Sequence, residues 1–144
     1  MPKHSLWARA AVLFAWVLPA LAIAGPSRID VFVERPTSLQ NQVALEQRGI
    51  AVHVHALDAV TRLQQAMSEG LPTQSDQAQQ EVFRRLQEQP DWSTQIGQAW
   101  QGRLLASQYR LTRLPAVVID GDANHVVYGT LDPGRAIQTW LQRR

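Results

Sequence analysis

The chain has 144 residues, no cysteine, and 14 basic against 12 acidic side chains. The absence of cysteine excludes thiol redox chemistry and disulfide bonds, so the stability of the chain must come from packing. Lys3 and Arg9 lie in an N-terminal segment that we expect to be removed, which leaves a mature chain of zero net charge. A neutral domain lacks the positive surface that nucleic-acid binding requires, so no direct nucleic-acid partner is expected.

Residues 1–24 have the pattern of a secretory signal peptide. A basic start precedes an unbroken apolar run, Ala10 to Ala24, and Ala22-Ile23-Ala24 supplies the small residues that a signal peptidase reads. The run is shorter than the roughly 18–20 residues that cross a bilayer, which disfavours the alternative of an uncleaved membrane anchor. We predict cleavage after Ala24 and a periplasmic protein, residues 25–144, that forms one domain without a membrane span.

The first half of the mature chain predicts a parallel β-α-β unit. Residues 29–34 and 50–57 are rich in β-branched residues and read as strands. Pro36-Thr37-Ser38 is typical of a helix start with hydroxyl caps, and Gly49 is typical of a helix end. In that helix Leu39 and Val43 are expected to be buried.

A helical insertion is predicted at about 58–111. Asp58 and Asp91 are candidate N-caps for the first and last of three helices, and Pro72 and Pro90 lie at the breaks. Apolar side chains recur at helical spacing in all three, which predicts that they face a core. They are Val60, Leu63 and Met67, then Val82, Phe83 and Leu86, and finally Trp92, Ile96, Trp100 and Leu104.

The C-terminal part predicts a β-hairpin and a closing helix. The strands are residues 117–120 and 125–128, joined through an Asp-Gly turn. Asp132-Pro133 is typical of a helix start. The apolar positions of this last helix, expected to be buried, are Ala136, Ile137, Trp140 and Leu141.

The predicted order, β-α-β, helical insertion, β-β-α, is that of an α/β thioredoxin-like fold. Several segments, in this order, also resemble a family of small exported proteins encoded in integrating conjugative elements. The carrying segments are residues 29–34, Ala56-Leu57-Asp58-Ala59 with Leu63, Glu69-Gly70-Leu71-Pro72, Ala99-Trp100-Gln101-Gly102, residues 114–121 and Val126-Val127-Tyr128-Gly129. The resemblance implies a cysteine-free thioredoxin-like fold and a role in conjugative DNA transfer, and it supplies no catalytic residues. It also predicts a cis peptide bond between Leu114 and Pro115.

The candidate binding site is a groove between two loops of this fold. Its residues are Arg35, Pro36, Thr37, Ser38, Arg113, Leu114 and Pro115. A redox-active relative would carry its cysteine pair at about residues 35–38. Here the hydroxyls of Thr37 and Ser38 have no assured base nearby, so we interpret them as helix caps rather than nucleophiles. The groove is expected to bind an extended peptide.

Histidines and tryptophans supply two further candidates. His53 and His55 point to the same side of one strand. Together with His125, and with or without Asp58, they could bind zinc or copper if they converged. We favour packed or hydrogen-bonded histidines over a metal site, and predict no cofactor. Trp92 and Trp100 fit a helix core, and they are also the candidate anchors of a protein interface.

The function expected from the sequence is therefore non-enzymatic. We expect an accessory protein of a conjugative, type IV secretion-like apparatus that acts by binding other periplasmic proteins. A cysteine-free periplasmic chaperone is the first alternative, since the same groove could hold an extended substrate transiently. A metal-binding or hydrolytic protein built on the three histidines is the less favoured one.

Overall fold

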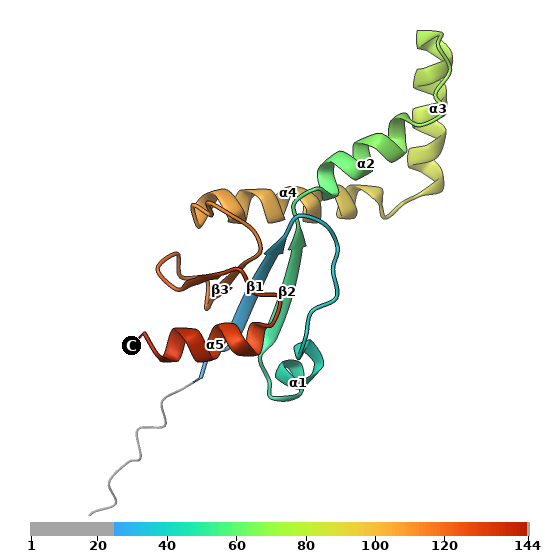
Figure 1. Ribbon diagram of the computed structural model, residues 1–144. Helices are drawn as coiled ribbons and strands as arrows, with labels where there is room; N and C mark the ends of the chain where they lie inside the picture. Colours follow the sequence, from blue (N-terminus) through green and yellow to red (C-terminus); the bar gives the residue numbers. More distant parts are fainter. Residues whose placement is uncertain (1–24, 144) are drawn as a thin grey trace, which may run out of the picture.

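The computed structural model describes residues 25–143 and contains one mixed four-stranded sheet (Figure 1). The strand order is β2-β1-β3-β4; β1 is parallel to β2 and antiparallel to β3, and β4 is antiparallel to β3. The strands are β1 (Arg28–Val33), β2 (Ala51–Ala56), β3 (Ala116–Ile119) and β4 (Val126–Tyr128). The predicted signal peptide, residues 1–24, lies outside the described residues.

The described part of the chain has five helices, in the predicted element order. They are α1 (Gln42–Gln47), α2 (Ala59–Ser68), α3 (Ser75–Glu88), α4 (Trp92–Gln108) and α5 (Pro133–Leu141). α1 connects β1 to β2, the three helices α2 to α4 form the insertion, and α5 follows β4. None of these helices is long and apolar enough to cross a membrane.

The sheet has a core on each face, because side chains alternate along each strand. On one face, the odd-numbered residues of β1 pack with Leu45 of α1 and Trp140 of α5. On the other face, Phe32 and Val118 pack with Ala106 and Tyr109 from the C-terminal end of α4. β1 and β3 are the central strands, and burial follows this: Val31, Phe32 and Val118 have no exposed surface.

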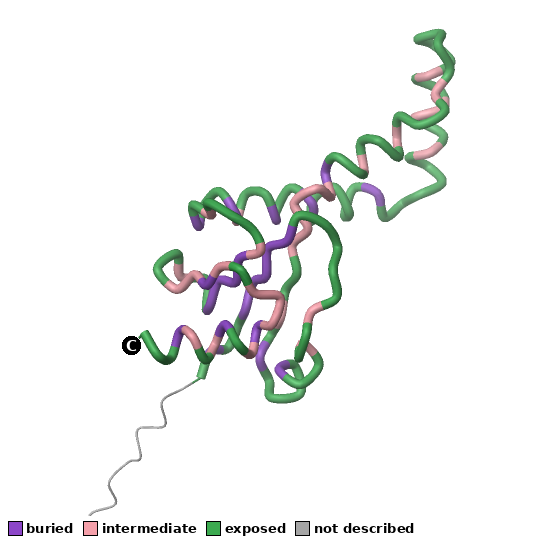
Figure 2. The backbone as a smooth tube through the Cα atoms, in the orientation of Figure 1, coloured by how far each residue is buried: buried purple, intermediate pink, exposed green. Residues whose placement is uncertain are grey.

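The insertion extends away from the sheet as an arm, defined here as residues 59–100 (Figures 1 and 2). α3 has no buried residue, so the prediction that its apolar side chains face a core is wrong. Phe83 is 63% exposed and Leu86 42%, because α3 lies beyond the end of the sheet, where no described element covers this side. In α2, by contrast, Val60 is buried as predicted.

The buried side of α4 differs from the predicted one. Its buried residues are Trp92, Ala99, Gly102 and Ala106, whereas Ile96, Trp100 and Leu104 are exposed. The reason is close approach: a methyl group placed on Gly102 would lie 3.2 Å from Cβ of His55 on β2. Small residues permit that contact, so the side of α4 that faces the sheet is the less hydrophobic one.

Three of the predicted helix caps are also wrong. α1 begins at Gln42, after a loop, and Asn41 rather than Ser38 precedes it in a left-handed conformation (φ 58°). Asp58 and Asp91 precede α2 and α4, but neither side chain caps its helix, and Asp58 instead pairs with Arg62 at 3.0 Å.

The start of α5 and the end of α1 are as predicted. Asp132 accepts hydrogen bonds from the amides of Gly134 (2.9 Å) and Arg135 (3.2 Å), and Gly49 follows α1 with φ 80°. Two side chains predicted to be buried are nevertheless exposed, Val43 in α1 (66%) and Leu141 in α5 (47%).

Candidate functional site

The predicted groove is a hollow of about 280 Å³ at the C-terminal end of β1. The Leu114–Pro115 peptide bond is cis, as predicted, and both residues line the hollow. The full lining is Val33, Glu34, Arg35, Thr37, Leu114, Pro115 and Leu131. Four of the seven predicted residues are thus brought together, whereas Pro36, Ser38 and Arg113 do not line the hollow.

The loop that forms one wall of the groove is held by the start of α5. The amide of Gln40 donates to the carbonyl of Leu131 at 3.2 Å, and the Asn41 amide group donates to Asp132 Oδ2 at 2.9 Å. These contacts hold residues 40 and 41 outside the helix, and α1 begins at Gln42. The groove therefore does not lie at a helix N-terminus. The Thr37 hydroxyl donates to the Arg35 carbonyl at 2.9 Å and is a loop contact instead of a cap.

Arg113 turns away from the groove. Its guanidinium lies 4.9 Å from the ring centroid of Tyr128 on β4, which is cation–π distance. The groove is left with apolar walls from Val33, Leu114 and Leu131, and one charge of each sign from Glu34 and Arg35. This lining suits contact with a peptide and presents no acid–base pair with a nucleophile.

A second hollow of about 280 Å³ lies in the arm, between α2 and α4. Trp92 and Trp100, the predicted anchors, both line it; Trp92 is 8% exposed and Trp100 47%. The other lining residues are Val60, Leu63, Gln64, Met67, Ser68 and Ile96. Trp92 is therefore buried at the N-terminal end of α4, while Trp100 remains accessible.

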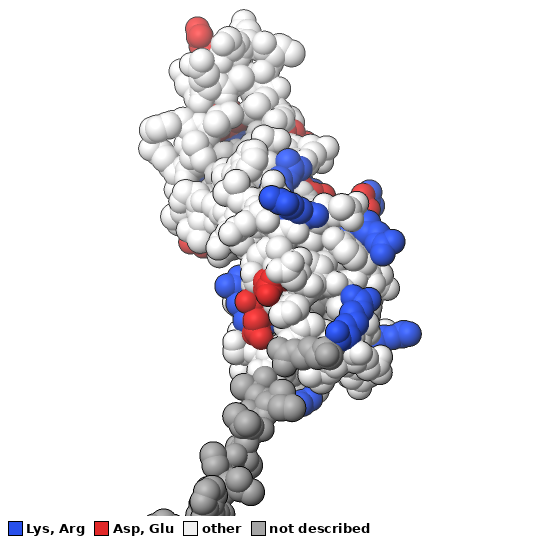
Figure 3. Space-filling model, turned by 90° about the vertical axis from the view of Figure 1, so that its left-hand side faces the viewer, with Lys and Arg blue, Asp and Glu red and all other residues white. Residues whose placement is uncertain are grey.

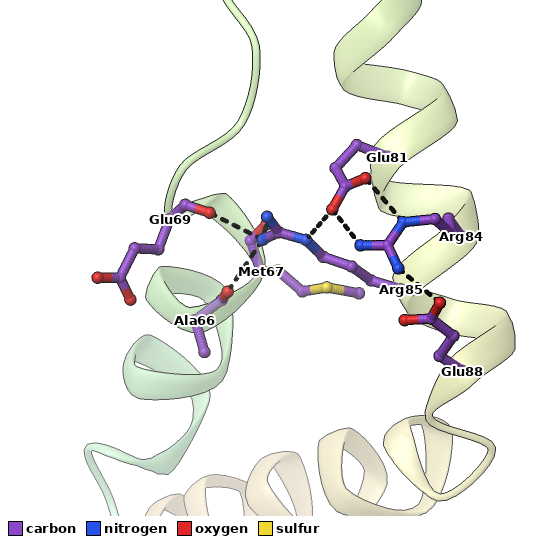
Figure 4. Close-up of polar contacts among 7 residues, drawn as sticks. All are labelled: Ala66, Met67, Glu69, Glu81, Arg84, Arg85 and Glu88. Atoms are coloured by element: carbon purple, nitrogen blue, oxygen red, sulfur yellow. Dashed lines mark hydrogen bonds and ion pairs between the residues drawn. The ribbon is translucent and has the colours of Figure 1, made fainter.

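Arg85 fixes α3 against α2 (Figure 4). Its Nη1 atom donates to the carbonyls of Glu69 (2.8 Å), Met67 (3.1 Å) and Ala66 (3.4 Å), which belong to the C-terminal end of α2. Its Nε atom donates to Glu81 at 2.8 Å. The side chain thus satisfies carbonyls that a helix end leaves free.

The remaining charges near the end of α3 neutralise one another. Arg84 donates to Glu81 at 2.6 Å and to Glu88 at 2.5 Å. Hydrogen bonds from Arg84 and, to a smaller extent, from Arg85 lower the pKa of Glu81 to about 2. This carboxylate is therefore charged at every physiological pH. On the face of the molecule shown in Figure 3, the arm carries few charged groups compared with the rest of the surface.

The exposed apolar side of α3 is a shallow open groove of about 390 Å³. It is lined by Ser75, Ala78, Gln79, Val82, Phe83 and Leu86, which we call the α3 strip. Sequence reasoning identified three of these residues by their helical spacing but placed them in a core. The spacing predicts an apolar helix face, and it does not show whether another part of the same chain covers that face.

Asp30 is a buried charge that the sequence analysis missed. It lies in the middle of β1 with no exposed surface, and its Oδ1 atom accepts from Arg28 Nη2 (2.9 Å) and lies 3.1 Å from His55 Nε2. Burial raises the pKa of Asp30, but the hydrogen bonds from His55 and Arg28 outweigh it, and the net shift is downward. Oδ2 has no partner among the described residues. An aspartate inside an apolar strand was the available signal.

The three histidines do not converge. His55 stacks on Phe32 with ring centroids 4.8 Å apart, on the α4 face of the sheet. His125 packs edge-on against Trp140, which belongs to the core on the other face. The described residues contain no group of three or more side chains that could hold a metal ion. His55 and His125 thus each pack against an aromatic ring, and the described residues do not bring the three histidines together as a joint metal site would require.

The described residues form a small mixed α/β protein with exposed apolar side chains at the groove beside Pro115 and on the α3 strip. Residues 31–144 match the family described as a protein of unknown function (DUF1525), and the chain belongs to that family. No curated protein matches the chain. No solved structure matches it either.

Proposed function

We propose that this protein is a non-enzymatic, periplasmic accessory of a conjugative DNA-transfer apparatus and acts by binding another exported protein of that apparatus. The observation that carries the binding role is the α3 strip: Phe83 and Leu86 are exposed on a helix whose orientation Arg85 fixes. A prearranged apolar surface loses little conformational entropy on binding, which favours affinity. The link to conjugation comes from the resemblance to proteins of integrating conjugative elements.

A thioredoxin-like fold is part of this proposal. Its support is the strand order β2-β1-β3-β4, the parallel β1–β2 pair, and a proline, Pro115, directly before β3. In a fold of this kind the groove beside Pro115 is where a redox-active relative would act. This chain has no thiol there, so the groove has no thiol redox role and the proposed function needs no cofactor.

A transient chaperone role is the second candidate, and the groove favours it. Leu114 is 36% exposed, and the surrounding Val33 and Leu131 make an apolar wall. Such a surface could hold an extended segment briefly. The two roles differ in where they act, since the stable accessory uses the arm and the chaperone uses the groove.

Transfer frequency from donor cells tests the proposal. Deleting the gene should lower transfer without changing the thiol status of periplasmic proteins, and the intact gene should restore it. A gene with Phe83→Ala and Leu86→Ala should restore transfer on the order of tenfold less well, because two interface side chains are lost. The exported protein should begin at Gly25 in mass spectrometry.

Leu141→Ala is the matched control, because Leu141 is about as exposed as Leu86 (47% and 42%) but lies on α5. It should restore transfer fully, as should Thr37→Ala with Ser38→Ala. Full restoration by the arm variant, combined with failure of a Leu114→Ser variant that still folds, would replace the accessory role with the groove-based one. A deletion without any effect on transfer would reject the conjugative role.

A further inference from the structure

The two edges of the sheet differ sharply. β4, at one edge, has three residues, and Arg113 covers its Tyr128 ring. β2, at the other edge, has six residues, pairs with β1 without a bulge, and contains no charged residue, proline or glycine. Long, regular, uncharged edges are what natural sheets usually avoid, because they pair with further strands.

Backbone geometry fixes which groups of β2 face outward. The amide of Ala51 donates to Ser27 and that of Leu57 to Val33, both at 2.9 Å, so the odd-numbered residues of β2 bond to β1. In a parallel ladder the alternate residues point the other way. The N–H and C=O groups of Val52, Val54 and Ala56 therefore face outward, and no described residue bonds to them.

We propose that β2 pairs with β2 of a second copy, antiparallel, about a two-fold axis at Val54. The outward set is symmetric about this residue, so Val54 meets Val54 and Val52 meets Ala56. This register engages all three outward residues of both chains. A register shifted by two residues would need the Ile50 amide in one direction and the Asp58 amide in the other. These amides already donate to the carbonyls of Leu45 and Glu34, both at 3.1 Å.

Side-chain chemistry supports a second copy as the occupant. Val52, Val54 and Ala56 lie on one face and are uncharged, so the pairing places only small apolar side chains opposite one another there. A six-residue strand pair alone buries less than a stable dimer needs. The two helices that contact β2 carry further exposed apolar side chains, Val43 on α1 and Leu104 on α4.

Sedimentation of residues 25–144 tests this inference, which does not depend on the proposed function. The wild type should be a dimer, and Val54→Lys should be a folded monomer with at least tenfold weaker association, because two lysines would meet at the axis. Leu141→Lys is the control; Leu141 is similarly exposed (47%) but lies on α5 and should leave the dimer intact.

A single cysteine in this cysteine-free chain gives a second measurement. Opposed Cα atoms in a hydrogen-bonded antiparallel pair lie about 5.5 Å apart, within the range for a disulfide. Val54→Cys should form a disulfide-linked dimer on oxidation, and Leu141→Cys should not. A monomeric wild type, a dimer that Val54→Lys leaves unchanged, or equal crosslinking by both cysteines would each overturn the inference.

Discussion

The sheet body and the arm use similar apolar side chains in opposite ways. In β1 and β3, Ile29, Phe32 and Val117 have no exposed surface, whereas Phe83 in α3 is 63% exposed. Figure 2 shows the same contrast between the buried backbone of the sheet and the exposed and half-buried backbone of α3. The body gains its free energy of folding from these contacts. The arm leaves comparable surface uncovered, so the residues of the α3 strip are free to serve an interface.

The largest expected difference between the two regions comes from truncating one phenylalanine in each. Phe32→Ala should lower the free energy of unfolding by about 3–5 kcal/mol, because a buried ring is removed and a cavity remains. Phe83→Ala should change it by less than about 0.5 kcal/mol. Urea unfolding of both variants measures the contrast, and equal losses would show that α3 is covered in solution.

Asp30 sharpens the comparison through pH. Asp30→Asn should lower the free energy of unfolding by about 1.5–3 kcal/mol at pH 7, because the charge-assisted hydrogen bonds to Arg28 and His55 are lost. The pKa of Asp30 is lowered in the folded chain, so this stability is fully present above the unfolded pKa and is lost as pH falls through the folded value.

The difference in free energy of unfolding between wild type and Asp30→Asn should therefore shrink as pH falls below the ordinary aspartate pKa of 3.8. Unfolding curves between pH 7 and pH 2 measure it. Asp76→Asn in the exposed first turn of α3 is the control and should differ from wild type by less than about 0.5 kcal/mol at pH 7. A difference for Asp30→Asn that stays constant with pH would contradict the assignment.

The smallest effect concerns two glycines of α4. Gly97 lies in the arm, and a Cβ added to it would meet no neighbouring side chain within 4 Å. Gly97→Ala should therefore stabilise the chain by about 1 kcal/mol through helix propensity. Gly102 faces His55, which Asp30 and Phe32 hold in place, so Gly102→Ala should destabilise the chain. Thermal unfolding separates the two, and equal stabilisation would mean that α4 does not pack closely on β2.

Local sequence predicted the strands well and the surroundings of the helices poorly. The alternation in residues 29–33 identifies both faces of β1, because period-two burial depends only on the sheet. The exposure of Phe83 and Trp100 could not be predicted, since it depends on where the sheet ends and on which side of α4 carries Gly102.

The candidate groove was predicted in part for a similar reason. Leu114 and Pro115 adjoin β3 and were placed correctly, whereas Thr37 lies in a loop whose course depends on the contact between Asn41 and Asp132, 91 residues apart. Asp30 was missed because its partner His55 lies on a neighbouring strand, and only the register of the two strands brings them together.

The contact of Arg85 with the end of α2 has a consequence for how the protein unfolds. This side chain joins two helices of the arm to each other, and neither helix contributes to the two cores of the sheet. Regions with few buried contacts unfold locally at a lower free energy than the rest of a protein. We therefore expect the arm to unfold as a separate cooperative unit, and its amide hydrogens should exchange with solvent well before those of β1 and β3.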